Sequence, residues 1–145
     1  PMTEQNAGSL PVLLPGFLAN GIAQIGILVP DIETAVRDYW EKLNIGPWQF
    51  YTYQKPLLKR MTLYGKSALY SMRIALTNFK DMRLELIQPL EGESIYKEFI
   101  REHGYGIHHA GIIVEDMQTS ISQAAEIGLN VIMDGSGFGV DGDGH

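Results

Sequence analysis

The sequence contains no cysteine in its 145 residues. This absence excludes disulfide bonds, thiolate zinc sites and cysteine nucleophiles. Positive charge is also scarce, because 11 Lys and Arg residues are outnumbered by 17 Asp and Glu residues, which gives a formal net charge of -6. The chain has no basic run dense enough to follow a phosphate backbone, so nucleic acid is not expected as a partner.

Long hydrophobic runs are missing as well, since no apolar stretch reaches the roughly 18 residues that a membrane-spanning helix needs. The opening residues, PMTEQNAGSLPVLLPG, lack the basic flank and the small-residue cleavage pattern of a signal peptide. We therefore predict a cytoplasmic protein with no membrane partner. Residues 1–21 are expected to form a polar tail followed by an apolar arm, which Pro11 and Pro15 interrupt.

One stretch of ten residues is written twice, 85 positions apart. Residues 22–31 are IAQIGILVPD and residues 107–116 are IHHAGIIVED, so that Gly26 matches Gly111. The chain therefore contains one module twice. At the third position of each copy, where an apolar strand would continue, the polar residues Gln24 and His109 occur instead. This pattern predicts a site where the two copies meet.

The first copy, residues 22–90, predicts the order β, α, β, β, β. The expected elements are a strand at 22–29, a helix at 32–43 that Asp31 caps, and strands at 48–53, 68–77 and 82–88, with a loop at 54–65 and a turn at 78–81. Residues 91–106 are expected to be a helical connector.

The second copy, residues 107–145, predicts a strand from residue 107, a helix at 117–127 and a strand at 129–133. Two strands of the first copy have no counterpart before His145, so we expect the second module to be incomplete. With 45% apolar residues, the chain forms one domain or two small halves that share a core.

Glu85 lies between Leu84 and Leu86 in the strand MRLELIQ, which places a carboxylate in apolar surroundings. Burial of an ionised carboxylate is costly unless it is paired or bound to a metal. Alternatively, Glu85 faces solvent beside Arg83, His109 is a hydrogen-bonded core histidine, and Gln24 is a polar edge residue. Two of the three occupy the same place in a repeat, however, and this favours a shared site.

These residues resemble the vicinal oxygen chelate superfamily, which includes glyoxalases, bleomycin resistance proteins and extradiol dioxygenases. The resemblance implies an α+β fold in which paired βαβββ modules form a cupped mixed sheet with helices outside. It also implies that Gln24, Glu85 and His109 are ligands of a divalent metal ion: cobalt, manganese, magnesium, nickel or zinc. The combination Gln, Glu, His is similar to that of glyoxalase I, whereas the run ELIQPLEGESIYKEFIREHGYGIHHAGIIVED looks most like the methylmalonyl-CoA epimerase branch.

The epimerase resemblance implies a metal-dependent enzyme that removes a proton from the carbon next to a carbonyl. The substrate would be an acyl-CoA or a thiol adduct, and the enzyme would be a homodimer. Substrate contacts are expected from Lys55, Lys59 and Arg60, which could meet the CoA phosphates, and from Tyr70, which could line the pocket. Solvated loop charges and a half-buried sheet tyrosine are the alternative interpretations of these four residues.

The catalytic bases are not identified by the sequence. The resemblance implies a catalytic Glu on the last strand of the second module, beyond His145. An epimerase also needs a second base on the opposite face of the substrate, yet no Asp or Glu occurs between Glu41 and Asp81. Glyoxalase I chemistry, the lactoylglutathione lyase reaction, would need only one Glu base.

Two further functions are compatible with the sequence. A metal-free binding protein of the bleomycin-resistance type would use aromatic residues such as Trp48 and Phe50 to stack on a planar ligand. An extradiol dioxygenase would normally have His in place of Gln24, which makes this activity the less favoured one.

Overall fold

The computed structural model describes residues 15–139, 141–142 and 144–145. Most of the predicted N-terminal tail and arm, residues 1–14, lies outside the described residues, and the described chain begins with a short 3-10 helix, η2 (Gly16–Leu18). No helix of the described chain is long and apolar enough to cross a membrane.

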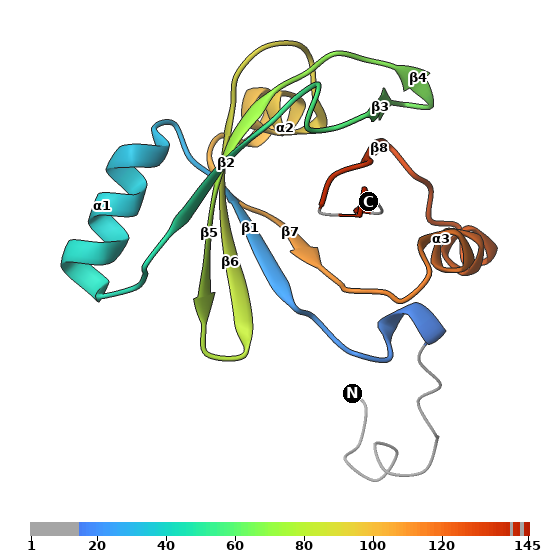
Figure 1. The fold of residues 1–145 in the computed structure, drawn as a ribbon, viewed down its shortest axis with the longest axis horizontal. Helices are drawn as coiled ribbons and strands as arrows, with labels where there is room; N and C mark the ends of the chain where they lie inside the picture. Colours follow the sequence, from blue (N-terminus) through green and yellow to red (C-terminus); the bar gives the residue numbers. More distant parts are fainter. Residues whose placement is uncertain (1–14, 140, 143) are drawn as a thin grey trace, which may run out of the picture.

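A five-stranded mixed sheet forms the centre of the molecule (Figure 1). Its order is β2 (Gln49–Tyr53), β5 (Met72–Phe79), β6 (Met82–Pro89), β1 (Gln24–Leu28) and β7 (Gly106–Gly111). Strand β1 runs parallel to β6 and antiparallel to β7, so the two repeated strands are direct neighbours. The predicted mixed α+β architecture is confirmed.

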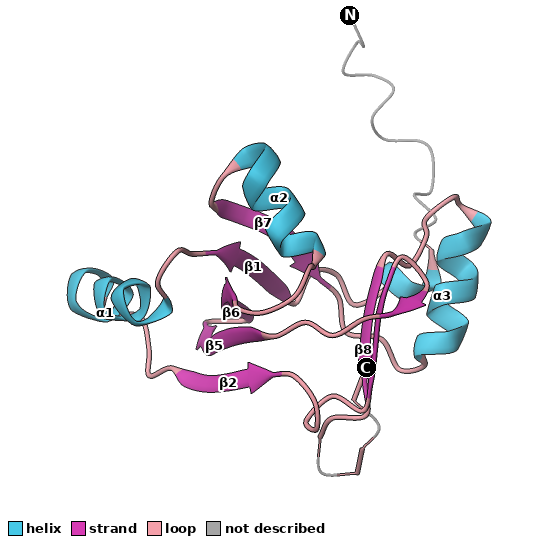
Figure 2. Ribbon diagram, turned by 90° about the horizontal axis from the view of Figure 1, so that it is seen from above, coloured by secondary structure: helices cyan, strands magenta, loops and turns pink. Residues whose placement is uncertain are grey.

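A second sheet contains β4 (Lys66–Ser67), β3 (Arg60–Leu63) and β8 (Met133–Ser136). Figure 2 shows that β8 lies across the direction of β2 and β5 rather than alongside them. The helices are α1 (Ile32–Leu43), α2 (Ile95–His103) and α3 (Met117–Glu126).

Helix α1 begins and ends where the sequence predicts. The Asp31 carboxylate accepts hydrogen bonds from the backbone N–H groups of Glu33 and Thr34, at 3.0 and 3.2 Å, which satisfies donors that the first turn leaves unpaired. At the other end, Asn44 adopts the left-handed conformation with φ of 56°. Ile32 is completely buried, so the first turn holds the helix against the sheet.

The two faces of the main sheet carry separate hydrophobic cores. The face toward α1 contains Val29, Ile32, Ala75 and Leu86, all of which are buried. The opposite face contains a larger core, on which residues of α2 and β8 pack; its buried members are Leu28, Leu58, Met61, Tyr70, Met72, Ile74 and Ile87. This second face also carries the polar residues singled out in the sequence.

Three predicted elements are wrong in extent. The segment 54–65 is not a continuous loop, because β3 forms within it: Met61 is buried, and Met61 pairs with Gly135 of β8. The strand predicted at 68–77 begins only at Met72, and Leu69 is 73% exposed. The strand predicted at 129–133 instead runs from Met133 to Ser136, where it finds its hydrogen-bonding partner in β3.

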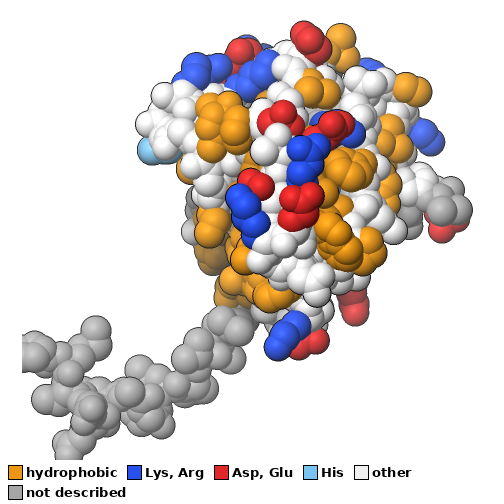
Figure 3. Space-filling model, turned by 90° about the vertical axis from the view of Figure 1, so that its left-hand side faces the viewer, with side chains coloured by type: hydrophobic (Ala, Val, Ile, Leu, Met, Phe, Trp, Pro, Cys, Tyr) orange, Lys and Arg blue, Asp and Glu red, His pale blue; other side chains and the backbone are white. Residues whose placement is uncertain are grey.

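The side of the molecule that carries α1 shows apolar side chains between charged ones (Figure 3). Trp40 and Phe50 are 49% and 42% exposed, and both line a hollow between α1 and β2. Two ion pairs lie on the same side of the sheet, Lys42 with Asp38 and Arg73 with Glu33. This surface is separated by the sheet from the polar residues of the opposite face.

Candidate metal and substrate site

Two rows of facing residues cross the main sheet at the place where the repeated strands meet. In the first row, Gly26 of β1 pairs with Glu85 of β6 on one side and with His109 of β7 on the other. In the second row, Gln24 pairs with Arg83 and with Gly111. Alternate residues of a strand face the same side of a sheet, and so do residues paired across neighbouring strands. Gln24, Gly26, Glu85 and His109 therefore share one face, and Gly26 lies on β1 between the strands that carry Glu85 and His109.

Gly26 leaves the space in which Glu85 and His109 meet. A Cβ atom at position 26 would lie 2.2 Å from Cε1 of His109, a distance that real Cβ contacts do not reach. Because this space is free, the imidazole lies over β1, and its Nε2 atom is 3.4 Å from Oε1 of Glu85. The two side chains belong to strands that are not neighbours, so the glycine makes their contact possible.

Gly111 has the equivalent relation to Gln24. A Cβ atom at position 111 would lie 2.9 Å from Cβ of Gln24. Each copy of the module therefore supplies one polar residue and, two positions later, a glycine that faces the polar residue of the other copy. The matched pair Gly26 and Gly111 was visible in the sequence, and it was the signal that could have predicted this arrangement.

The pairing of β1 with β7 is irregular at His108. Gly26 pairs with His109, but Ile27 pairs with Ile107, so His108 is an extra residue on β7. Bulges of this kind redirect side chains. Here Nδ1 of His108 lies 2.9 Å from Nδ1 of His109, and the His108 ring meets Tyr96 and Phe99 of α2 edge-on at centroid distances of 5.1 and 4.8 Å.

Burial is the main cause of a lowered pKa at His108, and the nearby His109 adds to it. The neutral form of His108 is favoured, so its ring can share one proton with Nδ1 of His109. Such a contact on one ring nitrogen fixes the orientation of the other, Nε2, which points toward Glu85. His108 therefore acts as a support for His109.

Gln24, Glu85 and His109 all line one cavity of about 360 Å³. Glu85 is 8% exposed, so its carboxylate is buried beneath this space. The cavity lies between the two sheets, and its remaining wall is mostly apolar or aromatic: Tyr53, Leu58, Tyr70, Met72, Ile74, Leu76, Arg83, Tyr96, Met133, Gly135, Phe138 and His145. The size and composition are those of a small-molecule site.

Two phenols of the cavity wall are held in their protonated form. Burial raises the pKa of Tyr53 and of Tyr96, and the charge of Glu85 raises both further. Tyr96 comes from α2 and Tyr53 from the end of β2, so they approach the cavity from different elements. Both remain hydrogen-bond donors at neutral pH.

Of the four predicted substrate-binding residues, one lines the cavity and three do not. Tyr70 lines the cavity, and its hydroxyl donates to the backbone carbonyl of Asp134 at 2.9 Å. Lys55, Lys59 and Arg60 are not among the described residues that line the cavity, and Arg60 forms an ion pair with Asp134 at 3.0 Å. Asp134 also contacts His145, so the β8 carboxylate lies between Arg60 and His145 beside the cavity.

The sequence profile of the Glyoxalase/Bleomycin resistance protein/Dioxygenase superfamily matches residues 23–145. The chain belongs to this superfamily. Among proteins of curated function, none gives a significant match.

Solved structures of similar fold come from several bacteria. A hypothetical protein from Bacillus halodurans C-125 is 28% identical, with 74% of this chain and 68% of that chain covered and a TM-score of 0.52. A variant of Streptomyces coelicolor methylmalonyl-CoA epimerase in complex with 2-nitronate-propionyl-CoA is 17% identical, with 84% and 79% covered and a TM-score of 0.58. Methylmalonyl-CoA epimerase from Mycobacterium tuberculosis is 18% identical, with 90% and 79% covered and a TM-score of 0.56.

Members of the superfamily commonly use divalent metals, and the donor set in the cavity fits such an ion. The three side chains offer a carboxylate oxygen, an imidazole nitrogen and an amide oxygen, which together suit divalent metals of hard or intermediate character. Within the described residues, no group of three or more His, Asp and Glu side chains is placed to hold a metal. With Glu85 and His109 as two donors, the amide of Gln24 would be the third.

Proposed function

We propose that the protein is a divalent-metal-dependent isomerase or epimerase that abstracts a proton next to a carbonyl, most specifically a methylmalonyl-CoA epimerase. The observation that carries the proposal is the meeting of Gln24, Glu85 and His109 at one cavity between the sheets. Membership of the superfamily supports it, as does the likeness of fold to epimerases whose bound ligands include methylmalonyl-CoA.

Gln24, Glu85 and His109 would hold the ion, whose chemistry is to stabilise negative charge on a carbonyl oxygen while the neighbouring carbon loses its proton. The chain's own residues prepare the site for this charge. Leu58, Ile74 and other apolar residues of the wall surround the donors with groups that do not hydrogen-bond, which strengthens electrostatic interactions inside the cavity.

Positioning is the task of the groups around the ligands. His108 fixes the ring of His109 through the contact between their Nδ1 atoms. The protonated phenols of Tyr53 and Tyr96 are hydrogen-bond donors that face the space above Glu85, where an acyl oxygen would lie. Both would orient the substrate as hydrogen-bond donors that stay un-ionised at neutral pH.

A glyoxalase I-type lyase is the second candidate, and one observation favours it. Among the described residues that line the cavity, Glu85 is the one carboxylate, and it is assigned to the metal. The lyase reaction needs one further catalytic base besides the metal ligands, whereas an epimerisation needs two. The proposed ligands are the same, and the substrate would be a thiol adduct such as a hemithioacetal.

The direct test is deuterium uptake at the α-carbon of methylmalonyl-CoA in heavy water, followed by mass spectrometry with cobalt or manganese added. We expect uptake that requires the metal. A protein that holds metal but exchanges no α-proton of methylmalonyl-CoA, and instead converts a glutathione hemithioacetal, would contradict the epimerase and support the lyase.

The ligand assignment is tested by His109→Ala. The substitution removes the nitrogen donor, so we expect metal affinity to fall by about 100-fold or more while the far-ultraviolet spectrum keeps its shape. His103→Ala is the matched control, because His103 is a histidine on the exposed surface of α2. Equal metal content in His109→Ala and in the parent, measured by calorimetric titration with cobalt, would refute the assignment.

A further inference from the structure

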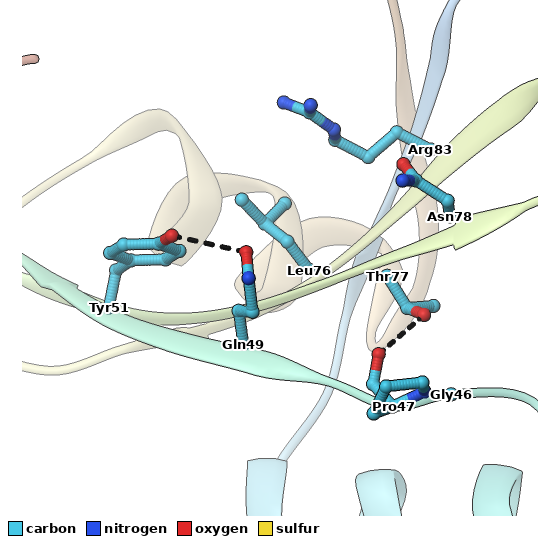
Figure 4. Close-up of a pocket in the computed structure, with 8 residues that line it drawn as sticks. All are labelled: Gly46, Pro47, Gln49, Tyr51, Leu76, Thr77, Asn78 and Arg83. Carbon is cyan, nitrogen blue, oxygen red and sulfur yellow. Dashed lines mark hydrogen bonds between the residues drawn. The ribbon is translucent and has the colours of Figure 1, made fainter.

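The main sheet ends in a second hollow that borders the central cavity. This groove of about 310 Å³, which we call the sheet-end groove, is lined by Gly46, Pro47, Gln49, Tyr51, Leu76, Thr77, Asn78 and Arg83 (Figure 4). Figure 4 shows that Gln49, Tyr51, Leu76 and Arg83 project from one face of the sheet, whereas Thr77 turns to the other, where its hydroxyl donates to the carbonyl of Pro47.

Arg83 and Arg37 are the two arginines of the described chain that form no ion pair within it, and Arg83 differs from Arg37 in lining a groove without a carboxylate, whereas Arg37 lines the hollow beside α1 together with Glu33. Arg60, Arg73 and Arg101 each form an ion pair, with Asp134, Glu33 and Glu93 respectively. Arg83 forms none with a described residue, although the chain as a whole is acidic. A guanidinium offers five hydrogen-bond donors and no acceptor, so an unpaired one in a groove is suited to an anion.

The other polar groups of the sheet-end groove add donors of the same kind. The Tyr51 hydroxyl donates to Oε1 of Gln49 at 3.2 Å, which leaves the amide N–H₂ of Gln49 free to donate in turn. Asn78, which faces Arg83 directly across the β5–β6 pair, offers a second amide. Among the described residues that line this groove there is no Asp or Glu, so its described wall carries no carboxylate that would repel an anion.

Arg83 also connects the sheet-end groove to the metal-binding residues. It lines the central cavity as well, together with Gln24 and Glu85. It pairs with Gln24 across β1 and β6, and it lies two residues before Glu85 on β6, a separation of about 7 Å along a strand. One molecule could therefore place an anionic group at Arg83 and also reach the proposed metal ligands.

We propose that Arg83, with Gln49 and Asn78, forms an anion subsite that binds a carboxylate or phosphate group of the substrate. The proposal rests on the proposed function for the identity of the substrate, but the subsite itself is defined by its own residues. The anion has two possible sources on an acyl-CoA: the free carboxylate of the acyl group and the phosphates of the nucleotide.

Calorimetric titration of the metal-loaded full chain tests the subsite. The probes are methylmalonyl-CoA, propionyl-CoA, malonate and inorganic pyrophosphate, and the variants are Arg83→Gln and Arg37→Gln. Arg37 is the matched control, since it is an exposed arginine of α1 on the opposite side of the sheet and also forms no ion pair with a described residue. Each variant removes one positive charge.

We expect Arg83→Gln to lower the affinity for the probe that carries the recognised anion by about 10- to 100-fold, and Arg37→Gln to leave that affinity unchanged. If Arg83→Gln lowers the affinity for methylmalonyl-CoA and malonate alone, the recognised group is a carboxylate. If it lowers the affinity for propionyl-CoA and pyrophosphate equally, the recognised group is a phosphate. Affinities that are the same in Arg83→Gln and parent for all four probes, equal losses in both variants, or no binding of any probe by the parent would overturn the subsite.

The same titrations separate this proposal from the proposed function. Binding of pyrophosphate or malonate that depends on Arg83, in a protein that neither binds methylmalonyl-CoA nor exchanges its α-proton, would support the anion subsite and refute the epimerase. Exchange that persists in Arg83→Gln at saturating substrate, with weakened binding, would support both.

Discussion

Gly26 shows how the absence of a single side chain shapes the candidate site. Its neighbours on both sides, Glu85 and His109, are separated by a whole strand and still come within 3.4 Å. The backbone at Gly26 does not need the left-handed region, so an alanine would be tolerated by the main chain itself. The effect of a substitution is therefore confined to the space that the imidazole occupies.

We predict that Gly26→Ala separates His109 from Glu85. The new methyl group would overlap the imidazole, whose Cε1 atom lies 2.2 Å from the ideal Cβ position, and the ring must turn away. Cobalt affinity should fall by about 10-fold or more, and the free energy of unfolding should fall by about 1 to 3 kcal/mol because the site becomes overpacked. Calorimetric titration and urea unfolding measure the two effects.

Gly16→Ala is the control for this experiment. Among the described residues, the nearest atoms that a Cβ atom there would meet belong to the end of the Gln123 side chain, at 3.2 Å, and that end can move. We expect metal affinity equal to that of the parent and a change in unfolding free energy within about 0.5 kcal/mol. If Gly26→Ala bound cobalt as tightly as Gly16→Ala, the steric role of Gly26 would be refuted.

At the scale of elements, the two repeated helices both begin with an aspartate N-cap. Asp31 caps α1, and Asp116, at the equivalent position of the repeat, caps α3 by accepting a hydrogen bond from the backbone N–H of Thr119 at 2.6 Å. This hydrogen bond is the main cause of a lowered pKa at Asp116. The ionised form is thus favoured in the folded protein over the unfolded one.

The lowered pKa of Asp116 predicts a pH dependence of stability with a definite sign. Its stabilising contribution is fully present above the pKa of the unfolded chain, near 3.8, and is lost as the pH falls through the lower folded value. Asp116→Asn keeps a capping oxygen but cannot titrate, so its unfolding free energy should decline less between about pH 5 and about pH 2 than that of the parent.

Chemical denaturation across this pH range measures the difference. Glu115→Gln removes the same charge at the neighbouring exposed position, which is not the capping residue, and serves as the control. A decline with falling pH that is as steep in Asp116→Asn as in Glu115→Gln would show that the cap does not account for the acid sensitivity.

Local signals explain which elements the sequence predicted. Helix α1 was predicted to the residue because Asp31 and Asn44 mark its ends chemically. Strand β3 was missed because only Met61 of its four residues is buried, and its partner β8 lies some 70 residues further along the chain. A strand that short is stabilised by long-range contacts rather than by its own pattern.

The sequence was enough to name the three main residues of the candidate site, but it did not predict how they are arranged. The repeat and the apolar setting singled out Gln24, Glu85 and His109, and the structure brings all three to one cavity. The bulge at His108 could not be predicted, since both copies of the repeat have the same length and the extra residue arises only from the pairing of β1 with β7. Arg83 was named only as a solvent-facing neighbour, because a single charged residue in a strand carries no signal of the groove beside it.

At the scale of the whole molecule, apolar side chains remain exposed over the second module. Ile107 of β7 is 70% exposed and Ile113 is 67% exposed, and further exposed residues follow α3: Ile127, Leu129, Val131 and Ile132. Strand β7 also forms an edge of the main sheet. Exposed apolar patches and open strand edges are common sites of association between chains.

We predict that the protein is a homodimer that covers this surface. Light scattering after gel filtration should give a mass of about twice the 16.2 kDa of the chain. The double substitution Ile107→Lys and Ile113→Lys places charge in the proposed interface and should yield a monomer, whereas Leu43→Lys at the end of α1 should leave the dimer intact. Dissociation by Leu43→Lys alone would instead place the interface over α1.

The crossed pairing of β1 with β7 bears on how such a molecule could arise. Gln24 faces Gly111 and His109 faces Gly26. Each module therefore has one polar side chain and one glycine, and its polar side chain occupies the space over the glycine of the other module. That reciprocity is the defining property of an isologous contact, in which one surface is complementary to itself. A lone module bearing such a polar residue and glycine would thus fit a second copy of itself, so fusion of two copies could have preserved an interface that already existed between separate chains.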